Sequence, residues 1–306
     1  MSLAFITPAI AGPFDLGSVV VRAGLRVNPV TAEITAVSDP LPTILHGIPL
    51  YLRDVRVNLD RSEFTLNPTS CDPMSFTGQA SSSTGAVAPL SERFQVAGCE
   101  RLAFKPRLAL RFFGKPHRSA HPRLRATLTA APGQVNIGKA VVTMPKTELL
   151  ENAHIRTICT RDQWAKDSCP KASIYGSARA FTPLLDQPLE GPVYLRANGG
   201  ARKLPDLVAD LKGQIDIELV GYIDAVNARL RTRFVNVPDA PVSKFVLNMQ
   251  GGKKSLLVHN TNVCKTKPRA SVKFDGQNGK HHDFNPVVKT SCGKGKKSGG
   301  AEKRAQ

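Results

Sequence analysis

The chain has 306 residues, of which 41% are hydrophobic and 22% charged, so it is long enough for two or three domains that fold without a structural metal. Its net charge of +18 is concentrated in residues 100–180, where 15 basic and 5 acidic side chains give +10. This is typical of a surface that contacts an anionic polymer, although charge that only keeps the protein soluble is the alternative. No apolar run reaches the length of about 18 residues that a membrane-spanning helix needs, which excludes such a helix.

Residues 1–99 are predicted to form a first β-sandwich unit. Over residues 51–59 (YLRDVRVNL) apolar and polar side chains alternate, which is the pattern of a half-buried antiparallel strand. Residues 9–11 (AIA) resemble a signal-peptide cleavage site, but no positively charged segment precedes them. We therefore expect a truncated chain, with the export signal further upstream.

Residues 100–180 are predicted to form an intervening, basic, β-rich unit. Its residues 112–126 (FFGKPHRSAHPRLRA) contain two prolines and a serine, which predicts an exposed loop that leads into a strand. On that strand, Arg123 and Arg125 would share one face. Six side chains of this stretch form the predicted site for an acidic polymer: Lys115, His117, Arg118, His121, Arg123 and Arg125. A solvated basic hairpin is the alternative.

A short helix is predicted over residues 160–167 (TRDQWAKD). Thr160 and Gln163 have the spacing of a capping box, in which each side chain bonds the backbone N–H of the other residue. The helix would be about two turns long and would lie between Cys159 and Cys169.

Residues 181–292 are predicted to form a second β-sandwich unit. Apolar side chains alternate with acidic ones around residues 215–219 and with arginines over residues 229–234, which predicts two more half-buried strands. Residues 293–306 contain no apolar periodicity and are predicted to be a disordered basic tail.

The first and second sandwich units resemble each other at five places in the same order, which indicates a duplication. Residues 64–71 (FTLNPTSC), for example, match residues 256–264 (LLVHNTNVC). The predicted fold is accordingly all-β, with two related units of immunoglobulin-like sandwich type flanking a third unit that contains the helix.

Six cysteines allow fifteen pairings, and the duplication favours three of them. The matched pairs, each 28 residues apart, are Cys71 with Cys99 and Cys264 with Cys292, which leaves Cys159 for Cys169. Free thiols and a zinc site are the alternatives, although no Cys-x-x-Cys occurs. Disulfides indicate an oxidising compartment and therefore export.

Catalytic motifs are absent from the sequence: it contains no G-x-S-x-G elbow, phosphate loop, dinucleotide fingerprint or H-E-x-x-H. The run His281-His282-Asp283 would need adjacent strand residues to face one metal, although they point to opposite faces. His154 and Cys159 would form a catalytic pair only if Cys159 were a free thiol. We expect no enzyme activity, metal or cofactor; an enzyme assembled from distant residues on a β scaffold is the alternative.

Five phrases of the chain, TLNPTSCDP, HIRTICTR, PLLDQPLEGPVYLR, LPDLVADLKGQIDIELVG and PDAPVSKFVLNMQGGKK, resemble those of a family of uncharacterised bacterial proteins that are predicted to be secreted or surface-exposed. The resemblance covers nearly the whole chain. It implies that the chain matches the C-terminal portion of longer proteins, and it assigns no activity and no site residues.

The sequence thus predicts a non-enzymatic extracellular or cell-surface protein with a structural or adhesive role. Its partner would be an anionic cell-surface polymer or another surface protein. A module that binds an anionic polymer such as a cell-wall polysaccharide is the alternative, and nucleic acid is the weaker form of it because aromatic residues for base stacking are few.

Mass spectrometry of the unreduced, alkylated protein, made in an oxidising compartment, tests the compartment. We expect three linked peptide pairs, joining residues 71 and 99, 159 and 169, and 264 and 292. Six alkylated cysteines would refute both the disulfides and the export, and would restore Cys159 as a candidate nucleophile.

Overall fold

The computed structural model describes residues 2–50, 56, 66–227 and 229–292. These residues form 21 strands, four 3₁₀ helices and one short α-helix, so the protein is all-β, as predicted. The strand predicted over residues 51–59 falls largely, and the tail predicted over residues 293–306 entirely, outside the described residues. In the part that the structure describes, no helix is long and apolar enough to cross a membrane.

The first seven strands form three small antiparallel sheets. Their bounds are β1 (Ser2–Ala11), β2 (Phe14–Val27), β3 (Ile34–Ser38), β4 (Ile44–Leu45), β5 (Ile48–Pro49), β6 (Met74–Ser81) and β7 (Val87–Phe94). The first sheet is β1–β2–β3, and β4–β5 and β6–β7 are hairpins. Many of their large apolar side chains are exposed, among them Ile10 and Phe76, so these strands bury little of a core.

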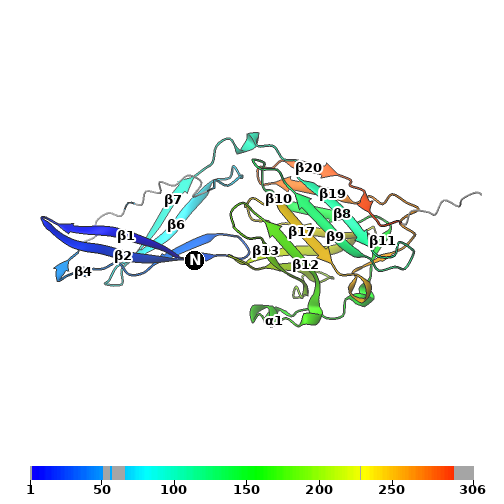
Figure 1. Cartoon of the computed structure of the whole chain (residues 1–306), viewed down its shortest axis with the longest axis horizontal. Helices are drawn as coiled ribbons and strands as arrows, with labels where there is room; N and C mark the ends of the chain where they lie inside the picture. The colour runs from blue at the N-terminus through cyan, green and yellow to red at the C-terminus, as the bar shows by residue number, and fades with distance from the viewer. Residues whose placement is uncertain (1, 51–55, 57–65, 228, 293–306) are drawn as a thin grey trace, which may run out of the picture.

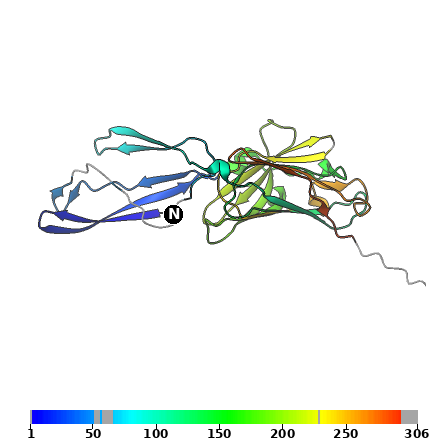
Figure 2. The ribbon, with the colours of Figure 1, turned by 90° about the horizontal axis from the view of Figure 1, so that it is seen from above.

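The remaining strands build a 12-stranded sheet and one small separate pair. Their bounds are β8 (Arg107–Phe113), β9 (Arg123–Thr129), β10 (Ile137–Thr143), β11 (Glu148–Leu150), β12 (Ile174–Phe181), β13 (Leu189–Arg196), β14 (Asp206–Leu211), β15 (Ile217–Val226), β16 (Arg229–Phe234), β17 (Lys244–Met249), β18 (Leu257–His259), β19 (Ser271–Gly276), β20 (His281–Phe284) and β21 (Val288–Lys289). The small pair is β11–β18. Figures 1 and 2 show the first seven strands at one end of the molecule and the large sheet at the other.

The large sheet curls until its two edges meet. Its strand order is β20-β19-β10-β16-β15-β14-β13-β12-β17-β9-β8-β21, and each neighbouring pair is antiparallel except β21 and β8. The two edge strands follow each other in the sequence. Backbone bonds from Ala270 N to Pro286 O (3.1 Å) and from Val288 N to Pro268 O (2.8 Å) join the segment before β19 to the segment that leads into β21. The inner face of the curl is therefore enclosed by one continuous sheet.

The core lies on this inner face. Period-two alternation sends Leu108, Leu110 and Phe112 of β8 inward, where each is at most 9% exposed, while Arg107, Ala109 and Arg111 face solvent. The alternation predicted over residues 229–234 coincides with β16, in which Leu230 is buried. Strands from opposite sides of the curl share one core cluster, which includes Leu195 and Phe274.

The predicted boundary between residues 180 and 181 falls inside β12, and strands from both sides of it alternate in the one large sheet. Twelve of the strands between residues 107 and 289 therefore belong to a single sheet. Tandem immunoglobulin-like sandwiches are not confirmed by this topology. The common descent of residues 5–99 and 181–292 stays a prediction.

The predicted helix is present as α1 (Arg161–Ala165). Thr160 is its N-cap: the Gln163 N–H donates to the Thr160 hydroxyl (3.2 Å), and the Thr160 N–H donates to the Gln163 side-chain carbonyl (3.0 Å). Both bonds of the capping box are thus formed. The helix is shorter than predicted, because Ser168 and the disulfide-bonded Cys169 follow within four residues of its end.

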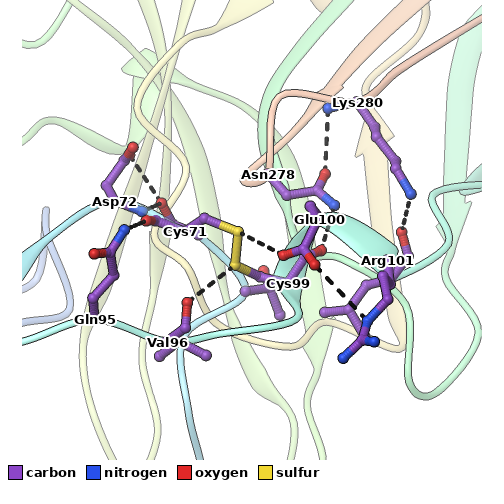
Figure 3. The surroundings of a disulfide bond; sticks show 12 residues. Cys71, Asp72, Gln95, Val96, Cys99, Glu100, Arg101, Asn278 and Lys280 are labelled. Carbon is purple, nitrogen blue, oxygen red and sulfur yellow. Dashed lines mark hydrogen bonds and ion pairs between the residues drawn. A yellow bond between two sulfur atoms is a disulfide. The ribbon is translucent and has the colours of Figure 1, made fainter.

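Three disulfide bonds cross-link the chain: Cys71–Cys99, Cys159–Cys169 and Cys264–Cys292. They are the same three pairs that the duplication favours. Figure 3 shows the first of them, which precedes the 3₁₀ helix η1 (Cys99–Arg101) between the N-terminal strands and the large sheet. There Asn278 donates to Cys99 O and Lys280 to Leu102 O, both at 2.7 Å, so the loop after β19 holds this connection.

A second connection depends on Asp239, in the loop before β17. Its carboxylate accepts hydrogen bonds from the backbone N–H groups of Thr69 (2.7 Å) and Ser70 (2.8 Å), from the Thr69 hydroxyl (2.6 Å) and from the Asn136 amide (2.8 Å). Charge-assisted bonds of this kind are stronger than neutral ones. Asp239 therefore joins residues 69–70 to two loops of the large sheet.

We expect Asp239→Ala to lower the free energy of unfolding by about 1–3 kcal/mol, because it leaves half-buried N–H groups without an acceptor. It should also speed limited proteolysis between residues 66 and 72. Asp283→Ala, which removes an exposed carboxylate of β20, is the control and should change neither quantity. Equal stability and equal cleavage of the two variants would contradict the role of Asp239.

Candidate functional site

The outer face of β8 and β9 carries a cluster of basic side chains. Arg111 and Phe113 of β8 and Arg123 and Arg125 of β9 alternate with inward-facing apolar residues, so all four point to the same side of the sheet. The three arginines are exposed, and Phe113 is half-buried. Together with Lys289 of β21 they form what we call the arginine face.

The guanidinium groups of the arginine face surround one aromatic ring. The centroid of Phe113 lies 5.1 Å from the Cζ atom of Arg111, 4.5 Å from that of Arg123 and 5.4 Å from that of Arg125. Each cation over a ring at an exposed site contributes about 0.5–1 kcal/mol. Asn248 of β17 accepts a hydrogen bond from Arg125 Nε (2.7 Å). The ring and the amide thus hold the arginines in place.

Strand register places like charges directly opposite each other. Lys289 is paired with Arg111, and Arg111 with Arg125, so three cations form a row across three strands. Like charges at directly opposite positions destabilise a sheet. The strands β8, β9, β17 and β21 lie wholly within the described residues, and none of them contains an acidic residue. The row therefore has no carboxylate of its own strands to neutralise it.

The loop between β8 and β9 presents the other predicted cations at its tip. Lys115, His117 and Arg118 are exposed. Backbone bonds join the loop to residues 259–263: Ser119 N donates to His259 O (2.8 Å), and Val263 N donates to Pro116 O (2.9 Å). The structure thus brings five of the six predicted residues to the β8–β9 hairpin surface, two of them on the arginine face.

His121, the sixth predicted residue, belongs to a different cluster. Its Nε2 lies 3.1 Å from the Glu151 carboxylate, and its ring centroid lies 4.6 Å from that of His154. The hydrogen bond with His121 lowers the pKa of the Glu151 carboxyl below its usual value. His121 is therefore committed to a partner and is turned away from the arginine face.

The cluster around His121 lacks the geometry of a nucleophilic site. His154 Nδ1 lies 2.9 Å from the backbone carbonyl of Ser255, while the Ser255 hydroxyl is bonded to the carbonyls of Pro122 and Leu257. A serine nucleophile would need its hydroxyl on the imidazole. Cys159 is fully buried and bonded to Cys169, so the predicted alternative of a Cys159–His154 pair has no thiolate.

Glu148 and His259 form a buried carboxyl–imidazole pair beneath the loop between β8 and β9. His259 Nδ1 and Glu148 Oε2 are 2.7 Å apart, both side chains are at most 1% exposed, and Phe112 packs edge-on against the imidazole. Burial raises the pKa of the Glu148 carboxyl above its usual value. Because neither side chain reaches solvent, the pair fixes β11 to β18 and supports the loop of residues 114–122.

The residues that could hold a metal do not assemble a site. Among the described residues, the one group of acidic, imidazole and thiol ligands that lies close enough is Cys71, Cys99 and Glu100. Its two sulfur atoms are joined in the disulfide of Figure 3. On β20, His281 contacts Asp275 (2.8 Å) while the His282 ring lies against Phe284, so these adjacent histidines point to opposite faces.

The inner face of β8 and β9, opposite the arginine face, borders a cavity of about 320 Å³. One wall comes from β9 and β17, the other from β10, β15 and β16. Loops of residues 130–136 and 237–243 flank one end, where Pro132 and Ser243 are exposed, so the cavity reaches the surface there. All of its lining residues are described, and none is charged.

Comparisons with protein-family models, with curated proteins and with solved structures each found no match. The resemblance to a family of exported bacterial proteins therefore stays a prediction.

The arginine face contains three residues that the sequence prediction omitted: Arg111, Phe113 and Lys289. The alternation of residues 107–113 (RLALRFF) indicates that Arg111 shares a face with Phe113. Lys289 carries no such signal, because its place depends on the pairing of β21 with β8, far apart in the sequence.

Charge repulsion on the arginine face is testable with Arg111→Gln. Salt screens the repulsion among Arg111, Arg125 and Lys289, so raising NaCl from 10 to 300 mM should stabilise the wild-type protein relative to this variant, by a few tenths of a kcal/mol. Chemical denaturation at both salt concentrations measures the difference. The matched control is Arg107→Gln on the same strand, because Arg107 is paired with Thr129. An identical response of the two variants would contradict the repulsion.

Proposed function

We propose that the protein is a non-enzymatic extracellular or cell-surface module that attaches to an anionic polymer through its arginine face. The observation that carries this proposal is the row Lys289–Arg111–Arg125, with Arg123 beside it, on strands that contain no acidic residue. A surface that keeps like charges opposite each other gains stability when an anion binds.

The geometry favours a polymer over a single small anion. Neighbouring strands lie about 4.8 Å apart, and the backbone positions of Arg123 and Arg125 are separated by about 7 Å along their strand. Guanidinium groups bind carboxylate, phosphate and sulfate in a bidentate manner, through two parallel hydrogen bonds. A chain with repeated anionic groups that lies across β21, β8 and β9 meets a cation on each strand. The exposed Lys115, His117 and Arg118 of the loop extend this surface beyond the ends of β8 and β9.

A polysaccharide fits this face better than a nucleic acid. Proteins that bind single-stranded nucleic acids stack the bases on free aromatic faces. Phe113 is the aromatic residue of the arginine face, and three guanidinium groups already surround its ring. Recognition would therefore depend on charge, as expected for an acidic cell-wall polymer.

Three disulfides support a location outside the cytosol, because such bonds persist in oxidising compartments. An adhesive role at a surface is supported by the arrangement of the molecule. The arginine face belongs to the large sheet, while the N-terminal strands at the other end expose Ile10 (73%) and Phe76 (68%). Exposed apolar side chains of this kind are typical of protein contacts.

Charge reversal of the arginine face tests the proposal. We expect the triple variant Arg111→Glu, Arg123→Glu, Arg125→Glu to lose roughly tenfold or more in affinity for dextran sulfate and to show a weaker dependence on salt, because fewer counterions are released. Retention on purified bacterial cell walls should fall in parallel. Affinity is measured by co-sedimentation and by titration at several salt concentrations.

The matched control changes the net charge by the same amount elsewhere. Lys146, Lys166 and Lys171 are exposed and lie outside the arginine face, so the triple variant Lys146→Glu, Lys166→Glu, Lys171→Glu should retain binding. Uncharged dextran should bind neither variant nor the wild type. Equal losses in the two triple variants would reduce the effect to net charge, and unchanged binding by the first would refute the site.

A further inference from the structure

The interior of the large sheet is not filled by its own side chains. Protein interiors contain few voids larger than a water molecule, whereas this one encloses about 320 Å³. Strand alternation directs Leu124, Ala126 and Leu128 of β9 inward, yet all three remain partly accessible. The same is true of Leu247, which lies beside Ala126 on the neighbouring strand β17. These side chains pack against the edge of the core and also line the accessible space.

Three of the polar side chains that line this space are bonded within the protein. The Asn136 amide donates to Asp239, the Gln134 carbonyl accepts from Lys105 N, and the Ser255 hydroxyl is bonded to the carbonyls of Pro122 and Leu257. Most of the other lining residues are Leu, Ile, Val, Ala, Pro and Met. A ligand here would be recognised by its apolar surface.

The dimensions favour a long, narrow ligand. A volume of about 320 Å³ falls at the lower end of the range of about 300–1,000 Å³ that is usual for ligand pockets, and it is about twice that of an apolar cavity that holds benzene. Its lining runs along β17 from Phe245 to Met249, which is about 14 Å of strand. At one end the lining residues Met249, Leu256 and Leu257 are buried, although Gln250 beside them is exposed. The other end opens between the loops of residues 130–136 and 237–243.

We propose that this cavity binds the aliphatic chain of an amphipathic molecule, with the methyl end near Leu256 and the polar end at the opening between the two loops. The site is separate from the arginine face, because it uses the opposite side of β8 and β9. It is also independent of the proposed function: a protein that does not bind polyanions can still bind the chain.

A competition assay on the unmodified, disulfide-intact protein tests the proposal. N-phenyl-1-naphthylamine is bound first, and its fluorescence is followed as 1-dodecanol, dodecanoate or dodecanoyl lysophosphatidylcholine is added. We expect 1-dodecanol to displace the probe at one molecule per chain. Displacement by dodecanoate identifies a free fatty acid as a source of the chain, and displacement by the lysophospholipid identifies a membrane lipid. Failure of all three would overturn the site.

Two variants that fill the cavity from opposite walls locate the binding. Ala126→Leu on β9 and Ala140→Leu on β10 should each weaken 1-dodecanol binding about tenfold or more, because the added methyl groups occupy the space of the chain. Ala109→Leu is the matched control, since Ala109 is exposed on the outer face of β8. Wild-type affinity in both folded cavity variants would overturn the proposal.

Crystals of the unmodified protein soaked with 12-bromo-1-dodecanol make the test independent of any variant's folding. Anomalous bromine density near Leu256, where the proposal places the methyl end, with the chain between β9 and β10, supports the site. Bromine found only on the exposed apolar strands of the N-terminal end, or no ordered bromine at all, contradicts it.

Discussion

The edge-to-edge closure of the 12-stranded sheet is the constraint on which the other features depend. Closure gives every strand an inner and an outer side. The period-two alternation of β8 and β9 therefore places their apolar side chains inside and their arginines outside. The last strand of the same sheet, β21, pairs with β8 and completes the row Lys289–Arg111–Arg125. An open sheet of the same strands would have no enclosed interior.

Both candidate sites are thus built from the same backbone. Arg123 and Arg125 face outward, while Leu124 and Ala126 between and beside them border the cavity. The two faces cannot vary independently, because a shift of β9 by one residue would exchange them. The Cys264–Cys292 disulfide, three residues beyond Lys289, and the Glu148–His259 pair beneath the hairpin loop hold the surroundings in one arrangement.

Local patterns predicted local structure well. The capping box at Thr160 and Gln163 coincides with α1, and alternation over residues 229–234 coincides with β16. The order of the strands in the sheet could not be predicted from local patterns, because strands such as β21 and β8 are neighbours in space but far apart in the sequence. The same limit applies to the sites. Arg123 and Arg125 were found from their spacing, whereas His121, in the same loop, turns to Glu151, and the cavity needs two walls that meet only after closure.

The pairing of β21 with β8 has a consequence for the way the chain folds. The edge of β8 stays without a partner in any folding intermediate in which residues 288–289 have not yet paired with it. Contacts between such distant segments also slow folding. Such an intermediate presents a strand edge that can pair with another chain, so aggregation competes with this last pairing step.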